Sequence, residues 1–169
     1  MSHLFDPLTL RGVTLRNRIG MSPMCQYSAQ DGIANDWHKI HLGSRAVGGT
    51  GLLIVEATAV EPRGRISPGC LGIWSDAHAE AFASTVAFCK SHGVKMGIQL
   101  AHAGRKASSH RPWQGSGDVS DADGGWQTVA PSEIRFSDSY RLPHALSVNE
   151  IRATQQAFVD AARRAIHAG

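Results

Sequence analysis

The chain has 169 residues, of which 42% are hydrophobic and 18% are charged, and its formal net charge at neutral pH is +3. These values are ordinary for a globular protein with one packed core. The basic residues are scattered along the chain, which argues against a nucleic-acid partner. No apolar run approaches the length of about 20 residues that a membrane helix needs, so we expect no membrane partner.

The cysteines and histidines exclude two further classes of protein. Three cysteines without a CxxC pair, in a sequence with no secretory signal, favour reduced thiols and a cytoplasmic location. His38 and His41 have the spacing of metal ligands on a helix, but no third ligand follows at a suitable distance along the chain. We therefore expect no metal site.

The N-terminal segment predicts short strands. Apolar residues alternate with polar ones on both sides of a turn at Arg11 and Gly12, which predicts a β-hairpin over about residues 3–17. The short apolar run 18–24 then predicts a strand that is stopped at Pro23.

Alternating strands and helices follow the hairpin. The continuous apolar runs 51–60 and 94–104 suit strands that are buried in a parallel sheet. Helices are expected over 36–49, 76–93 and 147–169, each beginning at a capping residue. The capping residues are Asn35 or Asp36, Ser75 or Asp76, and the capping box of Ser147 and Glu150.

Apolar residues at helical spacing indicate which face of two helices is buried. In the second helix these residues are Ala79, Phe82, Val86 and Cys89. In the third helix they are Ile151, Phe158, Ala162 and Ile166.

This order of elements predicts an α/β fold with parallel strands and right-handed crossovers. It fits either an open doubly wound sheet or the first three units of a (β/α)8 TIM barrel. Three strands make a poor open sheet, since both edges stay bare, so we favour a partial TIM barrel over residues 1–169, with its β/α units in 18–169. A closed barrel needs about 250 residues, and the sequence ends where a fourth strand should begin. The long segment 103–146 is expected to be a functional loop excursion.

In a barrel of this type the chemistry lies at the carboxyl ends of the strands. The three predicted strands end in the segments SPMCQYS (22–28), EATAV (56–60) and GIQLAHAGRK (97–106). Small residues such as Ser22 and Ala57 would let a flat ligand approach the backbone. No glycine-rich loop opens a helix after a strand, so a Rossmann or P-loop phosphate site lacks its signature.

These segments resemble the Old Yellow Enzyme family, and in particular its bacterial xenobiotic-reductase-like or thermophilic-like class. The resemblance is carried by LFDPLTLRGVTLRNRIGMSPMCQYSAQDG, GLLIVEATAVEPRGRISPGCLGIWSD and GIQLAHAGRKAS, in that order. It implies a (β/α)8 barrel that binds FMN and takes a hydride from NADPH or NADH. The reduced flavin of this family then reduces an activated alkene, such as an enone, which would be the small-molecule substrate.

The resemblance also implies roles for individual residues. Cys25 would lie beside the flavin ring and tune its potential, and Tyr27 would help to hold the carbonyl group of the substrate, so these two are the catalytic candidates. Ala57 would contact the ring edge through its backbone, and Gln99 would bond the pyrimidine side. The complete set of flavin-binding candidates is Ser22, Pro23, Met24, Cys25, Ala57 and Gln99. His102 and Arg105 are expected to organise the start of the excursion.

The sequence lacks several motifs that the family carries after the third strand. In the family, the histidine pair that binds the substrate oxygen follows strand four, and the phosphate-binding loops follow strands seven and eight. We therefore expect the N-terminal portion of an ene-reductase, which would be a homo-oligomer. The alternative is a non-catalytic partial barrel, or one half of a split enzyme, that needs a complementing chain. A dienoyl-CoA reductase or an amine dehydrogenase would append an iron–sulfur motif, of which the sequence has no trace.

Overall fold

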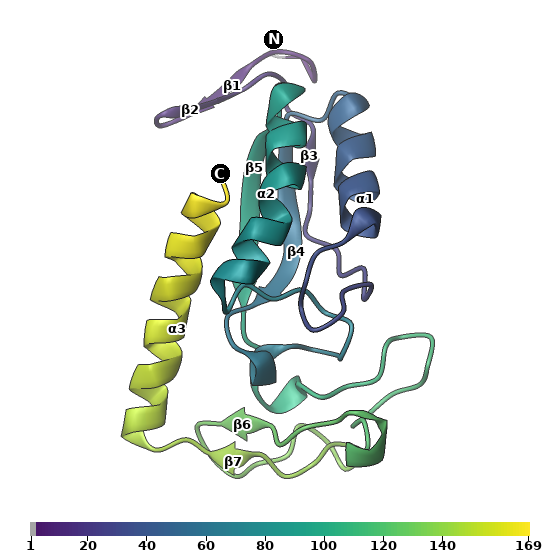
Figure 1. Cartoon of the computed structure of the whole chain (residues 1–169), viewed down its shortest axis with the longest axis vertical. Helices are drawn as coiled ribbons and strands as arrows, with labels where there is room; N and C mark the ends of the chain where they lie inside the picture. Colours follow the sequence, from purple (N-terminus) through teal and green to yellow (C-terminus); the bar gives the residue numbers. More distant parts are fainter. Residues whose placement is uncertain (1–2) are drawn as a thin grey trace.

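A three-stranded parallel sheet forms the centre of the molecule (Figure 1). The computed structural model describes residues 3–169, so residues 1–2 of the expected domain lie outside the described part. The strands are β3 (Gly20–Met21), β4 (Leu52–Ala59) and β5 (Lys95–Ala101), in the order β3-β4-β5. The predicted parallel α/β arrangement is confirmed, although β3 is shorter than the apolar run that predicted it.

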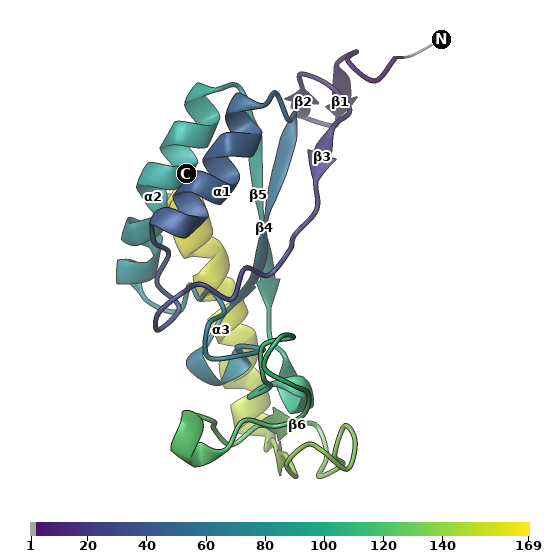
Figure 2. The same cartoon turned by 90° about the vertical axis from the view of Figure 1, so that its right-hand side faces the viewer.

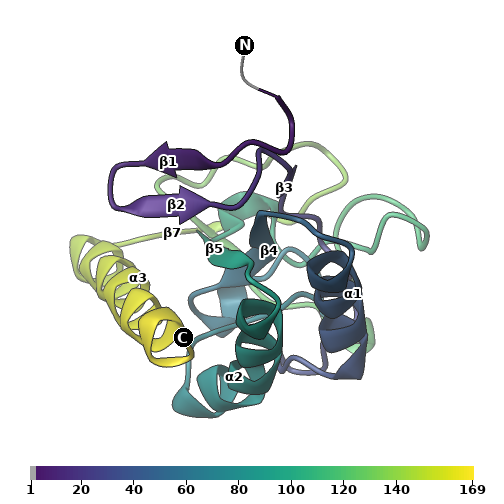
Figure 3. The same cartoon turned by 90° about the horizontal axis from the view of Figure 1, so that it is seen from above.

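Three helices cover one face of this sheet: α1 (Asp36–Val47), α2 (Asp76–Ser91) and α3 (Val148–His167). Figure 2 shows α1 and α2 together on that face, and Figure 3 shows the three helices in an arc around it. The main core lies between the sheet and the first two helices. Its buried residues include Leu42, Ala46, Leu53, Val55, Phe82, Val86 and Cys89. No helix within residues 3–169 is both long and apolar enough to cross a membrane.

The predicted hairpin is present as β1 (Leu8–Leu10) and β2 (Val13–Leu15), with Arg11 in the turn at a φ of +52°. It lies at the amino ends of the strands (Figure 1). Arg16, just after β2, donates to the backbone carbonyls of Ala46, Thr50 and His92, which follow or end the first two helices. A cation suits these carbonyls because helix C-termini carry partial negative charge. The hairpin is thus attached to the base of the helical layer.

The segment between β5 and α3 is folded, with little regular structure. It contains η2 (Gly104–Lys106), η3 (Asp121–Asp123) and a parallel pair of two-residue strands, β6 (Val129–Ala130) and β7 (His144–Ala145). Arg141 ties it together through ion pairs with Asp118 and Asp121, at 2.8 Å and 2.9 Å. A further short helix, η1 (Pro62–Gly64), follows β4. The excursion lies at the carboxyl ends of the strands, opposite the hairpin (Figure 1).

The predicted packing face is confirmed for α2 and is wrong in part for α3. In α2 the four predicted residues Ala79, Phe82, Val86 and Cys89 are all buried. In α3 the buried side runs instead through Ala157, Phe158, Ala161 and Ala165. Ile151 and Ile166, which the spacing assigned to this face, are 38% and 79% exposed. Ile166 nevertheless lines an apolar cavity beside the sheet, where no other element within residues 3–169 covers it.

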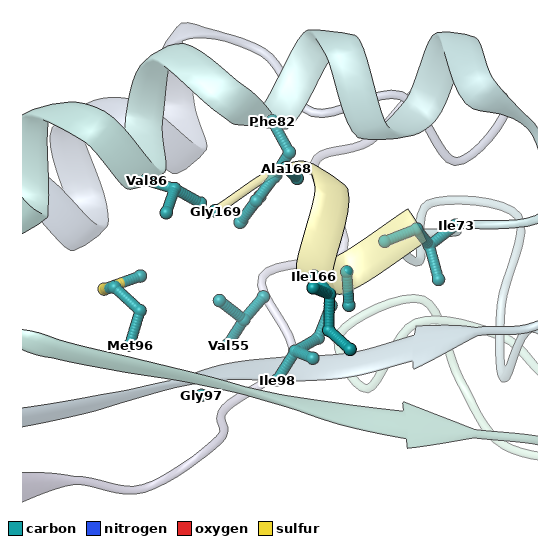
Figure 4. Close-up of a pocket in the computed structure, with 11 residues that line it drawn as sticks. Val55, Ile73, Phe82, Val86, Met96, Gly97, Ile98, Ile166, Ala168 and Gly169 are labelled. Carbon is teal, nitrogen blue, oxygen red and sulfur yellow. The ribbon is translucent and has the colours of Figure 1, made fainter. Parts of the chain in front are cut away.

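An apolar cavity of about 240 Å³ lies between the sheet and the end of α3 (Figure 4). Val55 and Ile98 line it from the strands, Phe82 and Val86 from α2, and Gly169 from the C-terminal end. The side chains that line it are all apolar, so no side chain there could orient a polar ligand. The cavity belongs to the layer between sheet and helices, and we do not assign it a ligand.

The capping box of α3 gives a prediction about stability. The Ser147 hydroxyl accepts a hydrogen bond from the Glu150 amide, and the Glu150 carboxylate accepts one from the Ser147 amide. Ser147→Ala should lower the free energy of unfolding by about 1 kcal/mol, because an N-cap hydroxyl is lost. Denaturant unfolding checks this, with Ser84→Ala at an exposed position within α2 as the control. Equal stabilities of the two variants would contradict the prediction.

Candidate functional site

A β-bulge at Glu56 shapes the carboxyl edge of the sheet. The register of β4 against β5 runs Ile54 to Gly97 and Val55 to Ile98, and it then skips Glu56, so that Ala57 pairs with Gln99. Side chains alternate between the two faces of a strand, so without the extra residue Ala57 would point toward the helices, as Val55 does. The bulge turns Ala57 to the opposite face.

This opposite face, which we call the inner face, carries little bulk beside Gln99. Ala57 and Gln99 are neighbours on it by register, and Gly97 lies two residues before Gln99 on the same strand. A Cβ added at Gly97 would come no closer than 3.7 Å to its nearest neighbour, a carbon of Ile54. The Gln99 side chain is exposed. A low apolar surface next to an exposed amide fits a flat heteroaromatic ring that has hydrogen-bonding edges.

The segment after β3 lies along the same edge and is held by hydrogen bonds to β4 and α1. The Gln26 amide donates to Oε2 of Glu56 at 3.1 Å. Its side chain donates to the Met24 carbonyl at 2.8 Å and accepts from the indole of Trp37 at 3.1 Å. Met24 is 46% exposed, and Ser22 is also exposed while Pro23 is half-buried. The segment is therefore fixed on the protein side and open on the other.

Cys25 meets β4 and a second thiol that the sequence analysis did not single out. Its thiol hydrogen-bonds to the thiol of Cys70 and to the backbone of Ala57, with the Glu56 carboxyl nearby. The bond to Cys70, together with burial, raises the pKa of Cys25 above its ordinary value. The same bond lowers the pKa of Cys70, assisted by the amide and hydroxyl of Ser67. Cys25 thus keeps its proton at neutral pH.

Tyr27 lies at the outer end of the segment, in a constrained conformation. Its φ is +52°, a region that a residue with a Cβ seldom adopts. The carbonyl of Tyr27 lies so close to Gly69 that a Cβ there would collide with it. The phenol ring meets the ring of Trp113 edge to face, with centroids 5.5 Å apart. Burial raises the pKa of Tyr27, so the phenol is neutral and can donate a hydrogen bond.

Glu56 is almost fully buried, with an exposed fraction of 4%. Burial raises the pKa of its carboxyl to about 8, and the hydrogen bond from Gln26 opposes this shift. At neutral pH the side chain is therefore largely protonated. A protonated carboxyl can occupy a buried bulge without the cost of an unpaired charge.

His102 and Arg105 hold the start of the excursion, His102 by a contact to the segment after β4 and Arg105 by contacts within the excursion. Nδ1 of His102 accepts from the Gly104 amide at 3.0 Å, so the other nitrogen carries the proton and donates to Glu61 at 2.7 Å. This bond from His102 is the main reason why the pKa of Glu61 is lowered. Arg105 donates to the carbonyls of Ile134 and Arg135 across the excursion. The contacts of both residues are structural.

The structure brings Cys25, Ala57 and Gln99 together at one edge of the sheet, with Ser22, Pro23, Met24 and Tyr27 on the adjoining segment. Three residues that contact this group were not among the predicted ones: Glu56, Cys70 and Trp113. The sequence gives one indirect signal for Glu56, which is an acidic residue inside a continuous apolar run. Cys70 and Trp113 lie on two loops that fold back onto the site, and no local sequence pattern predicts that they contact it.

Comparisons with known proteins identify relatives of this chain. A family model described as the NADH:flavin oxidoreductase / NADH oxidase family matches residues 3–169. An NADPH dehydrogenase of Geobacillus sp. (strain WCH70) is 51% identical over 168 residues, which cover 98% of this chain and 45% of that protein. The chain thus spans less than half the length of the curated relatives it matches.

Two solved structures match the fold at similar coverage. Morphinone reductase in complex with tetrahydroNAD gives a TM-score of 0.82 at 30% identity, covering 100% of this chain and 47% of that one. The old yellow enzyme homologue from Zymomonas mobilis gives 0.81 at 30% identity, covering 99% and 46%. The expected fold class, the first three β/α units of a TIM barrel, is confirmed. The chain belongs to the NADH:flavin oxidoreductase / NADH oxidase family.

Proposed function

We propose that the chain forms the N-terminal part of an FMN-dependent NAD(P)H oxidoreductase that reduces the C=C bond of enones and related electrophilic alkenes. When bound, FMN supplies the hydride chemistry between the nicotinamide and the alkene, and the protein supplies orientation and hydrogen bonds. The observation that supports this proposal most directly is the bulge at Glu56. It leaves Ala57 and Gln99 side by side on an open face, next to the Cys25 thiol.

The proposed roles follow from chemistry and exposure. Gln99 would offer its amide to the pyrimidine edge of the flavin, where both a donor and an acceptor are needed. Ala57 would contact the ring edge through its backbone, since its small side chain leaves the backbone accessible. The remaining lining residues would be Ser22, Pro23 and Met24, with Cys25 beside the ring. Tyr27 would donate a hydrogen bond to the carbonyl group of the substrate.

The domain, location and assembly belong to the same proposal. We take residues 1–169 as one partial barrel, with the hairpin over about 3–17, the units over 18–169 and the excursion over about 103–146. The protein would be cytoplasmic and would act as a homo-oligomer. The rest of the barrel would come from further residues of the same polypeptide or from a complementing chain. The unpaired edge of β5 supports this, because β5 pairs only with β4 among the described strands.

The test is to express the chain together with the C-terminal remainder of its barrel. We expect a yellow protein that binds FMN and oxidises NADPH or NADH when cyclohexenone is added. The visible spectrum reports the flavin, and the fall of absorbance at the nicotinamide band reports turnover. A correctly folded protein that cannot be reconstituted with FMN would refute the proposal. If the chain forms a partial barrel without catalysis, FMN binds and no enone is reduced.

The proposed role of Gln99 gives a quantitative prediction. Gln99→Ala should weaken FMN binding by about 1–2 kcal/mol, a roughly 5- to 30-fold rise in Kd, because one or two hydrogen bonds to the ring are lost. Fluorescence titration with FMN measures this. Gln155→Ala, at an exposed position on α3, is the matched control and should leave the Kd unchanged. Equal affinities of both variants would count against Gln99 as a ligand of the flavin.

The proposed role of Cys25 gives a prediction about redox potential. Cys25→Ala should retain FMN and lower the flavin midpoint potential by on the order of 30 mV, or about 1.4 kcal/mol for two electrons. The reason is that a neutral thiol dipole stabilises the more electron-rich reduced ring. Spectroelectrochemical titration checks this, together with the KM for the enone. Cys89→Ala, in the core away from the site, is the control. An unchanged potential and unchanged kinetics would remove the tuning role.

A further inference from the structure

Two histidine nitrogens in the core have no hydrogen-bond partner among residues 3–169: Nε2 of His38 and Nε2 of His41. Both histidines lie on α1, where their spacing had suggested a metal site. His38 is only 1% exposed. A buried N–H or ring nitrogen without a partner costs free energy, so such groups are rare in folded proteins. We therefore expect each of these two nitrogens to have a hydrogen-bond partner that the protein itself does not supply.

Nδ1 of His38 is engaged at the cap of its helix. It lies 3.1 Å from the backbone amide of Asn35 and 3.0 Å from Oδ1 of the same residue. Burial lowers the pKa of His38 to about 4, which keeps the ring neutral at physiological pH. The unpartnered Nε2 is a donor in one neutral tautomer and an acceptor in the other, and a water molecule can pair with either.

The carboxyl of Glu56 lies close to this nitrogen. Nε2 of His38 lies 3.7 Å from Oε1 of Glu56, beyond the distance of a direct hydrogen bond. Polar groups separated by such a distance are commonly bridged by water. The other carboxyl oxygen, Oε2, already accepts from the Gln26 amide. Oε1 therefore has capacity for one more partner.

A small cavity of about 10 Å³ joins these groups. His38, His41 and Glu56 line its polar side, and Met21, Met24 and Leu42 are among the apolar residues of its walls. A volume of roughly 10–15 Å³ suffices for one water molecule, which also needs between two and four polar partners. The cavity offers three. It is too small for any larger ligand.

We propose that His38, His41 and Glu56 hold one buried water molecule, and that this hydrated cluster positions the Met24–Gln26 segment of the flavin site. The proposed water rests on the cavity and the unpartnered nitrogens alone. The proposed positioning of the Met24–Gln26 segment rests also on the proposed function. The water bonds to His38, and the carboxyl of Glu56 is then held at both oxygens, one by the water and one by Gln26. Glu56 acts on the flavin through this segment and is a positioning residue.

The water site is tested by a crystal structure at about 1.5 Å resolution. We expect one ordered water within about 2.7–3.2 Å of Nε2 of His38 and Oε1 of Glu56. A direct bond between these two atoms, or a cavity without density, would overturn the proposal. So would a metal ion with an anomalous zinc signal, although no group of three metal-ligating side chains suited to an ion is found within residues 3–169.

The pH dependence of unfolding tests the same cluster in solution. Glu56 holds its proton more tightly in the folded chain, so its contribution to stability is full below its unfolded pKa and is lost as pH rises toward about 8. The groups that face it are His38 and His41 from α1, Cys25 after β3, and Cys70, whose lowered pKa acts in the opposite direction. Glu56→Gln isolates the carboxyl from these neighbours.

We expect the unfolding constant of the unmodified chain, divided by that of Glu56→Gln, to rise roughly tenfold per pH unit between about pH 5 and 7.5 and to level off above about pH 8. A ratio that stays flat over this range would overturn the assignment of a protonated carboxyl to the cluster. Glu80→Gln, at an exposed carboxylate on α2, should give a flat ratio.

The positioning role is tested by FMN titration of the chain joined to the rest of its barrel. Glu56→Leu should raise the Kd for FMN at least tenfold. Glu56→Gln, which keeps an acceptor for Gln26 and a polar group for the water, should restore it to within about threefold of the unmodified protein. An unchanged Kd in Glu56→Leu, or no rescue by glutamine, would contradict the positioning role. An unmodified protein that binds no FMN would contradict the proposed function instead, while the crystal and pH measurements decide the water site independently.

Discussion

The extra residue at Glu56 is the constraint on which the candidate site depends. A parallel strand without a bulge would continue its alternation and direct Ala57 into the helical layer. The bulge reverses this alternation at the carboxyl end of β4, so that Ala57 and Gln99 share the inner face. The same bulge places an acidic side chain inside the protein. The chain tolerates it because the carboxyl is protonated and bonded to the Gln26 amide.

The two faces of the sheet have different surroundings. The outer face, with Leu53 and Val55, packs against α1 and α2 and forms the core. The inner face is small and open beside Gln99. The two ends of the strands differ as well. Arg16 ties the hairpin to the helices at the amino ends, whereas the carboxyl ends carry Cys25, Tyr27 and the excursion. The packed core and the candidate site thus lie on different faces of one sheet.

Much of the fold could be predicted from sequence because the signals are local. The hairpin turn, the apolar run of β4 and the capping box of Ser147 are each encoded within a few residues. The packing face of α3 was predicted only in part, because burial along this helix depends on which distant elements cover it, and local spacing does not encode that. The length of β3 could not be predicted either, since it depends on how many residues pair with β4.

The candidate site was predictable to a lesser degree. Its predicted residues came from a family resemblance, which identifies motifs and not the contacts between them. The contacts of Cys25 with Cys70, and of Tyr27 with Trp113, join segments that are more than 40 residues apart in the sequence. His38 and His41 have the spacing of metal ligands, but no third ligand follows along the sequence, and no metal site was expected. Their polar neighbour in space is Glu56, on a different element.

The measurement that tests the central claim most directly is a crystal structure of the FMN-loaded protein. The account predicts that Glu56 is skipped in the pairing of β4 with β5, and that the Gln99 amide and the Ala57 backbone lie within about 2.7–3.2 Å of the edge of the flavin ring. A flavin bound elsewhere, or a regular strand in which Ala57 faces the helices, would contradict it.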